Sequence, residues 1–178
     1  MEVVSRHARL FLRKCKGAGE KPAPAAVGPA VASLVGGTLA ILWLVWLTRM
    51  SGHSLLIAPF GATTVLLFAA KDSPLAQPRN VIGGHLVATA IALAMLSVFG
   101  PSLWAMGVAV GVSIGVMQLT RTTHPPAGAD PILVFLAPPA WHFLWSPVLV
   151  GAVALVALAL IFNNLNSSRG QRWPRWWL

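Results

Sequence analysis

The sequence predicts an all-α membrane protein that is built from two inverted repeats. Hydrophobic residues make up 56% of its 178 residues and charged residues only 10%, with a mean hydropathy of +0.73. This composition is typical of membrane-spanning helices and excludes an ordinary soluble domain. Prolines and glycines interrupt two of the apolar stretches, around Pro59 and around Pro126. Each repeat is therefore expected to be a long helix, a broken short helix and a long helix. Together they give four full spans and two short, discontinuous helices.

The basic residues divide the chain into three parts. The net charge is +9, and six of the 13 Lys and Arg residues lie within the first 21 positions. We expect a basic N-terminal segment over 1–26, a transmembrane domain over 27–165 and a basic, Trp-rich tail over 166–178. Basic ends are typical cytoplasmic anchors, so both termini are expected in the cytoplasm, against membrane lipid. No nucleic-acid-binding motif accompanies the charge, and nucleic acid is not an expected partner.

The first repeat is predicted from one long apolar stretch, one interrupted stretch and a second long one. Residues 1–16, ahead of it, form either an amphipathic surface helix or a disordered segment. Val31–Thr48 is long enough to span. Pro59 and a following glycine restrict the next helix to about residues 60–70, roughly 15 Å at 1.5 Å per residue and about half the hydrocarbon thickness. Val81–Phe99 then spans.

The second repeat follows the same plan. Leu103–Leu119 is expected to span and carries three glycines at four-residue spacing, which let another helix approach either inside the subunit or at a dimer seam. The three are Gly107, Gly111 and Gly115. No helix runs through Pro125 and Pro126, but Pro126 can open a new one, expected over Ala127–Ala137. Pro147–Phe162 is the last span.

An internal repeat relates the two halves at an offset of 67 positions. Pro59-Phe60-Gly61-Ala62 matches Pro126-Ala127-Gly128-Ala129, and Gly84 matches Gly151. Leu66, Phe68 and Ala70 match Leu133, Phe135 and Ala137 at the same offset. The offset indicates a duplication.

Charge decides whether the two short segments cross the membrane or dip into it and return. With the N-terminus inside, six crossings put Lys71, Arg79 and Arg121 inside and leave only Arg49 outside, whereas four crossings put all of them outside. The positive-inside rule therefore favours six crossings. Three crossings per half invert the repeats, so the N-termini of the two short helices point at each other near the midplane.

The start of the second short helix is the predicted binding site. Unpaired backbone N–H groups and the positive end of the dipole bind anions at a helix N-terminus. Arg121 adds charge, and His124 can carry a proton because its reference pKa is about 6.5. Alternatively, His124 only hydrogen-bonds the carbonyls of the break. The expected substrate-binding residues are Arg121, Thr123, His124, Gly128 and Ala129 in one half and Gly61, Ala62 and Thr63 in the other.

Three further polar residues are candidates for a proton relay or for a structural role. Asp130 lies in the first turn of the second short helix, where it stabilises the dipole and can pair with Arg121. Arg79 is either part of the relay or a lipid anchor. His85 lies one turn inside the same helix, with a partner that the sequence does not identify.

Three segments carry a resemblance to a known family. Thr123-His124-Pro125-Pro126-Ala127-Gly128-Ala129 resembles the signature of the HPP family of integral membrane proteins, as do residues 59–62 and 73–85. The resemblance covers about residues 28–165. It implies a protein of the bacterial inner membrane, in a family usually described with four spans. Plant plastid and cyanobacterial members are associated with nitrite transport, so the resemblance implies a small monovalent anion, nitrite first, as the substrate.

The expected function is therefore an anion transporter or channel, with a membrane scaffold or regulator as the alternative. An intramembrane metal enzyme is a further alternative, because His85, His124 and Asp130 are possible ligands. No His-Glu-x-x-His spacing or serine nucleophile motif is present, and Cys15 is the only cysteine. We expect no enzyme, metal or cofactor. A subunit this small is expected to form a homo-oligomer, a dimer.

Overall fold

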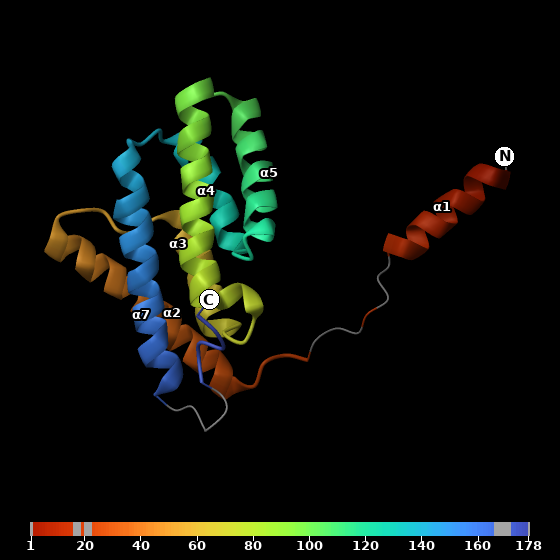
Figure 1. Ribbon diagram of the computed structural model, residues 1–178. Coiled ribbons are helices and arrows are strands. Elements are labelled where there is room, and N and C mark those ends of the chain that lie inside the picture. Colours follow the sequence, from red (N-terminus) through yellow and green to blue (C-terminus); the bar gives the residue numbers. More distant parts are fainter. Residues whose placement is uncertain (1, 16–18, 20–22, 166–171, 178) are drawn as a thin grey trace.

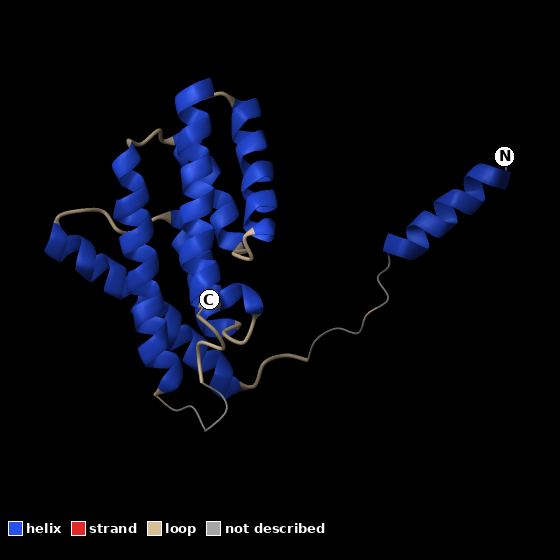
Figure 2. Ribbon diagram, viewed as in Figure 1, coloured by secondary structure: helices blue, strands red, loops and turns tan. Residues whose placement is uncertain are grey.

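The computed structural model describes residues 2–15, 19, 23–165 and 172–177, and that part consists of helices joined by loops, with no strand (Figure 2). In chain order the helices are α1 (Glu2–Cys15), α2 (Val27–Ser51), α3 (Ala58–Ala69), η1 (Pro74–Ala76), α4 (Pro78–Phe99), α5 (Leu103–Leu119), η2 (Pro125–Ala129), α6 (Asp130–Leu136), η3 (Trp141–Leu144), η4 (Trp145–Leu149) and α7 (Val150–Asn164). The all-α prediction is confirmed.

Three helical stretches are long and apolar enough to cross a membrane. They are α2, α4 and the 24-residue stretch Trp141–Asn164, which joins η3, η4 and α7. α5, predicted as the fourth full span, has 17 residues and covers about 26 Å at 1.5 Å per residue, slightly less than a hydrocarbon core of about 30 Å. α3 is short, as predicted, with 12 residues.

α1 settles the alternative for the N-terminal residues in favour of a helix. It lies apart from the bundle in Figure 1. Leu10, Phe11 and Leu12 are exposed on it, beside basic side chains in its last turn. An exposed helix with this composition is suited to a membrane surface.

Contacts between helix ends show that α3 runs back along α2. Near the start of α2, the Ser33 hydroxyl donates to the Phe68 carbonyl at the end of α3 (2.9 Å). Near the end of α2, the Thr48 hydroxyl accepts from the backbone N–H of Leu55, ahead of α3 (3.0 Å). The interrupted segment therefore carries the chain back towards the end of the bundle at which α2 began.

Most basic residues of the bundle gather at that same end. The Arg79 guanidinium at the start of α4 donates to the Thr120 carbonyl at the end of α5 (2.9 Å). From the C-terminal tail, Arg175 forms an ion pair with Asp72 in the α3–α4 loop (2.7 Å). We call this the basic end; its members are Lys71, Arg79, Arg121 and Arg175. Arg49 lies at the opposite end, in the last turn of α2.

The second short helix differs from its prediction. It was expected as one α-helix over Ala127–Ala137, but the chain forms the 3-10 helix η2 first and becomes α-helical only at Asp130. Pro131 explains the difference, because it has no N–H to donate to the carbonyl of Ala127. That carbonyl instead accepts from the N–H of Asp130, which closes a 3-10 turn.

Three hydrophobic clusters hold the described bundle together, and α4 belongs to all of them. The first joins α4 to α2, α3 and α7, the second joins it to α5 and α6, and the third joins it to α5 and η2. The fully buried members of the first include Ala40, Leu44, Phe60, Leu67, Val81, Ala152 and Leu155. In Figure 1, α4 stands between α7 and α5. α4 is therefore the central helix against which both short helices pack.

The glycine ridge on α5 does not pack inside the subunit. A Cβ built on each of its three glycines meets nothing within 4 Å, and Gly107 and Gly111 are exposed. The intrasubunit alternative is therefore wrong, because α5 turns this face away from the bundle. The dimer seam stays a prediction.

Two other glycines allow close helix contacts at matching positions of the repeat. A Cβ on Gly151 would run into the ring of Phe60 and lie 3.0 Å from the Leu55 carbonyl. A Cβ on Gly84 would lie 2.6 Å from the Cβ of His124 and 2.9 Å from the Thr122 carbonyl. Each glycine thus allows a long helix to touch the break of the other half.

We expect Gly151→Ala to lower the apparent melting temperature in detergent, because overpacking at a backbone contact costs about 1–3 kcal/mol. Gly37→Ala is the matched control, since a Cβ at Gly37 in α2 meets nothing within 4 Å. Equal melting temperatures for the two variants would show that α7 does not approach Phe60 this closely.

Candidate functional site

Four polar side chains meet in the interior of the bundle, in the order Asp130, His85, Thr63, His124. We call them the histidine chain. Each has an exposed fraction of 0%. Burial of this kind is costly for ionisable groups unless they are paired and hydrogen-bonded, so the contacts between them determine whether the arrangement is stable.

Four separate segments supply the histidine chain. Thr63 lies in the second turn of α3, and His85 lies in the second turn of α4. His124 directly precedes η2, and Asp130 is the first residue of α6. The two interrupted segments therefore meet directly, at Thr63 and His124, beside α4.

Hydrogen bonds link the four side chains into one continuous path. Asp130 Oδ2 lies 2.7 Å from His85 Nδ1. His85 Nε2 lies 2.9 Å from Thr63 Oγ1, which lies 3.0 Å from His124 Nε2. His124 Nδ1 lies 2.8 Å from the carbonyl oxygen of Leu75, where the path ends. Both ring nitrogens of both histidines are therefore occupied.

The Leu75 carbonyl fixes the direction of these bonds. A carbonyl only accepts, so His124 Nδ1 carries a proton and donates it. When His124 is neutral, its Nε2 must accept, and the Thr63 hydroxyl donates to it. Thr63 in turn accepts from a protonated His85 Nε2. One further proton is then shared between His85 Nδ1 and the Asp130 carboxyl group.

The break that carries His124 is tied to α4 by backbone contacts. The Asn80 side-chain amide donates to the Thr123 carbonyl (2.9 Å). Gly83 and Gly84 leave room for this segment, because a Cβ on Gly83 would lie 2.8 Å from Thr122 Cγ2. The position of His124 therefore depends on Gly83 and Gly84, which have no side chain to displace the segment from this turn of α4.

The C-terminal tail holds the loop that contains Leu75. The Gln77 side chain is fully buried and donates to two carbonyls of the α3–α4 loop, at 3.0 and 2.8 Å. Its Oε1 accepts from the backbone N–H of Arg175 (2.8 Å). The tail thus braces the loop whose carbonyl orients His124.

Asp130 has one satisfied oxygen and one that is not. Oδ2 accepts from Thr89 Oγ1 (3.3 Å) in addition to its contact with His85. Oδ1 is buried and has no hydrogen-bond partner. Unpaired buried carboxylate oxygens are rare, and they mark places where a proton or a ligand is held.

Comparison with known proteins supports one family. The family model for the HPP transmembrane region matches residues 22–174, most of the chain. The chain belongs to the HPP family. The resemblance of the three sequence segments is thereby confirmed, and the chain is a membrane protein.

Two relatives of the HPP protein come from Dictyostelium discoideum, and both are described as transmembrane proteins. One is 35% identical over 130 residues, which cover 68% of this chain and 45% of the relative. The other is 30% identical over 179 residues, which cover 94% of this chain and 57% of the relative. The chain thus spans about half the length of the curated relatives it matches. No solved structure matches it significantly.

The HPP segments coincide with the histidine chain. His124 lies in the signature segment, His85 ends the run 73–85, and Thr63 directly follows the segment 59–62. Leu75, whose carbonyl ends the path, lies in the same run as His85. The three segments are therefore distant in sequence but adjacent in space.

The predicted site residues of the HPP protein divide into two groups. Thr63 and His124 are in contact, as expected for opposed short segments. Gly61, Ala62 and Arg121 are exposed, whereas Thr123, Gly128 and Ala129 are half-buried. The structure therefore brings together only part of the set that the sequence analysis proposed as one site.

Arg121 does not pair with Asp130. It lies exposed at the basic end with φ 57°, a left-handed conformation that turns the chain at the end of α5. Asp130 contacts His85 instead, because it faces α4 from α6. The sequence analysis also missed Thr89, although a threonine four residues after His85 lies on the same helix face.

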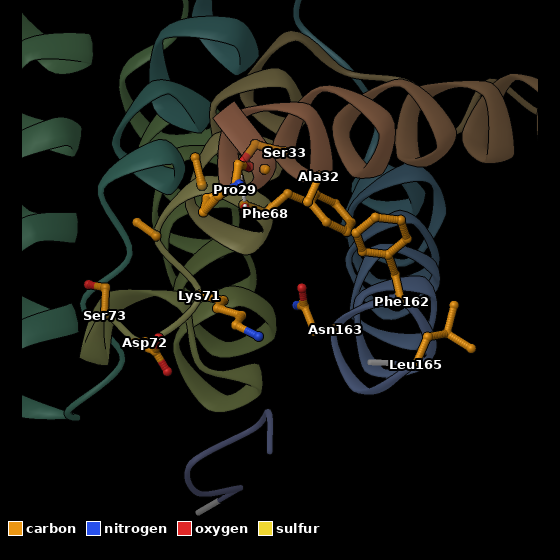
Figure 3. Close-up of a pocket in the computed structure, with 13 residues that line it drawn as sticks. Pro29, Ala32, Ser33, Phe68, Lys71, Asp72, Ser73, Phe162, Asn163 and Leu165 are labelled. Carbon is orange, nitrogen blue, oxygen red and sulfur yellow. Dashed lines mark hydrogen bonds between the residues drawn. The ribbon is translucent and has the colours of Figure 1, made fainter. Parts of the chain in front are cut away.

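Two pockets open at opposite ends of the HPP protein. The larger, about 880 Å³, lies at the basic end between α2, α3 and α7 and is lined by Ser33, Lys71 and Asn163 among others (Figure 3). The other, about 490 Å³, is lined by His53 and Trp145 among others. Neither is lined by a member of the histidine chain, which is enclosed in this conformation.

The candidate metal ligands of the HPP protein form a path rather than a coordination sphere. His85 points one nitrogen at Asp130 and the other at Thr63, so its two nitrogens face different partners. Within the described ranges, no group of three His, Cys, Asp or Glu side chains is arranged to hold a metal ion.

We expect His85→Leu to destabilise the protein by about 3–5 kcal/mol, because it leaves the buried Asp130 carboxyl group without its charged partner and with only the Thr89 hydroxyl as a donor. The double variant His85→Leu/Asp130→Leu should recover part of the loss. The stabilities of the single and the double variant are compared by their apparent melting temperatures in detergent. His142→Leu, at an exposed histidine, is the control. A double variant less stable than His85→Leu would show that the pair is not coupled.

Proposed function

We propose that this HPP protein moves a small monovalent anion across a membrane, with nitrite as the first candidate. One observation carries the proposal: an aspartate, two histidines and a threonine hydroxyl lie fully enclosed between two interrupted segments of a membrane domain. Ionisable residues inside a membrane domain are costly, and they mark ion and proton pathways. The enclosed chain favours a carrier, which opens to each side in turn, over an open channel.

We further propose that the two halves are inverted repeats, and reciprocal contacts support this. Gly84 touches the Thr122 carbonyl in the second half, and Gly151 touches the Leu55 carbonyl in the first. The two contacts are equivalent under the repeat, because Gly151 lies 67 positions after Gly84 and Thr122 lies 67 positions after Leu55. Transporters with inverted repeats bind their substrates at the repeat interface, beside discontinuous helices.

His85 lies where the two halves meet. Its Nε2 contacts Thr63 and its Nδ1 contacts Asp130, and these two residues are also 67 positions apart. One imidazole therefore bridges equivalent positions of the two short segments. A group so placed responds to a shift of either half, as a coupling residue of a carrier must.

The basic end is proposed to be the cytoplasmic end, in a bacterial inner membrane. Lys71, Arg79 and Arg121 lie there with the C-terminal tail, and Arg49 lies opposite. This distribution fits six crossings under the positive-inside rule. Positive charge around the larger pocket also raises the local concentration of anions, with Lys71 in its lining.

A cysteine at Arg121 should react with an impermeant thiol reagent only from the cytoplasmic side, in a Cys15→Ser background. A cysteine at Ser54, exposed at the opposite end, should react only from outside. The measurement is labelling of intact cells against inverted membrane vesicles. Labelling of both positions from the same side would restore the four-crossing topology.

Removing Arg121 should lower anion uptake at every pH, by about tenfold, because its charge at the basic end raises the local concentration of anions and does not titrate. Arg121→Lys should keep most of the uptake, since Lys carries the same charge at this exposed position. Arg49→Gln, at the opposite end, is the matched control.

The measurement is uptake of nitrite, nitrate, formate and chloride into vesicles that contain the wild type, Arg121→Gln, Arg121→Lys or Arg49→Gln. Vesicles without protein give the background. If well-folded wild type takes up none of these anions, anion transport is wrong and the scaffold alternative becomes the better one.

A further inference from the structure

While His124 is neutral, the Thr63 hydroxyl has two possible acceptors, His124 Nε2 and the Pro59 carbonyl, but only one proton to donate. It lies 2.9 Å from His85 Nε2, 3.0 Å from His124 Nε2 and 3.3 Å from the carbonyl oxygen of Pro59, one turn earlier in α3. A hydroxyl donates one hydrogen bond and accepts two. The position of its single proton therefore sets the direction of the whole histidine chain.

We propose that Thr63 is the switch of a proton relay that passes a proton between the Asp130–His85 pair and His124. The relay makes the transport of the anion proton-coupled. This inference rests on the proposed function and deepens it, because it identifies the coupling ion and the residues that carry it.

The transfer carries one positive charge from His85 to His124 by two concerted proton shifts. At the start, His85 is an imidazolium paired with the Asp130 carboxylate, His85 Nε2–H donates to Thr63, and Thr63 donates to neutral His124. The Thr63 proton then moves to His124 Nε2, and the His85 Nε2 proton moves to Thr63 Oγ1. His124 is now an imidazolium and His85 is neutral. The number of protons on the four groups is unchanged, and Asp130 keeps its charge.

The transfer is reversible. After it, the Thr63 hydroxyl donates to His85 Nε2 and accepts from His124 Nε2–H, and the same two protons shifting back restore the starting arrangement. When both Nε2 atoms carry a proton, the hydroxyl accepts from both and donates to the Pro59 carbonyl instead. Threonine in a helix commonly makes this bond to the preceding turn.

The surroundings leave the proton few other routes. His85 from α4, Asp130 from α6 and His124 ahead of η2 are the titratable groups joined by the path. The ring of Phe60 from α3 packs edge-on against His85, at 5.1 Å between ring centroids. All four members of the histidine chain are fully buried, so they do not exchange protons directly with bulk water in this conformation.

The two ends of the relay differ. At one end, Asp130 Oδ1 is buried without a hydrogen-bond partner, so a proton donor or water that reaches it finds a free acceptor. At the other end, His124 Nδ1 donates to the carbonyl of Leu75, in the loop at the basic end. A carbonyl accepts this hydrogen bond but does not take up the proton, so a proton that reaches His124 stays on its ring in this conformation.

The test compares Thr63→Val, which keeps the shape and removes the hydroxyl, with Thr63→Ser, which keeps the hydroxyl. Thr64→Val is the matched control, because the Thr64 hydroxyl donates to the carbonyl of Gly61 in its own helix (2.7 Å). Purified proteins in vesicles that contain a pH dye are given nitrate or nitrite, with and without a pH gradient. Nitrate is included because its acid is too strong to carry protons through the lipid.

In wild type, Thr63→Ser and Thr64→Val, anion uptake should be accompanied by a pH change and should rise when the pH gradient is imposed. In Thr63→Val, both effects should fall at least tenfold while the amount of folded protein stays the same. Anion uptake that is equally pH-coupled in Thr63→Val overturns the relay. Wild-type uptake without any pH change also overturns it and leaves anion transport standing.

A second measurement decides the relay if no anion is transported. Nitrogen-15 spectra of the histidine rings in lipid nanodiscs should show His124 protonated at Nδ1 and accepting at Nε2, and His85 protonated at Nε2. Thr63→Val should shift the ring signals of these two histidines and leave those of His53 unchanged. A His124 protonated only at Nε2, or spectra that Thr63→Val leaves unaltered, would overturn the relay independently of transport.

Discussion

A polar group inside a membrane domain has no water to solvate it and needs hydrogen-bond partners within the protein. In the HPP protein, His85 supplies such partners to both short segments. Its two ring nitrogens contact Thr63 on α3 and Asp130 on α6, so the first and second short segments are joined through one side chain of α4. Neither segment is long enough to span alone. Their stability therefore depends on packing against α4 and on these hydrogen bonds.

The same constraint explains why one face of α4 carries small residues. The chain break that carries His124 must lie against another helix, because irregular backbone is not tolerated in contact with lipid. Gly84 admits the break, and Asn80 caps one of its carbonyls. On the other side of the bundle, Gly151 of α7 admits Phe60 in the same way. Small residues thus replace the hydrophobic driving force that would hold helices together in water.

The histidine chain is also connected to the surface of the protein. His124 donates to the carbonyl of Leu75, and the loop around it is braced by Gln77 and the tail residue Arg175. A movement of the tail or loop would change the acceptor that fixes the proton on His124. The enclosed path is therefore connected, through the backbone of this loop, to the C-terminal tail at the basic end.

The sequence by itself determined the helical membrane class, the two interrupted segments and the family, because hydropathy, proline and glycine act locally and leave clear patterns. It also singled out His85, His124, Thr63 and Asp130. Only the tertiary structure decided that these four form one path, that Asp130 pairs with His85, and that Arg121 stays at the surface. α6 begins at Asp130 rather than at Ala127 because of Pro131, a local signal that is present in the sequence but was not used in the prediction. Within the histidine chain, side-chain partners lie up to 61 positions apart, and no local pattern encodes which of them burial brings together.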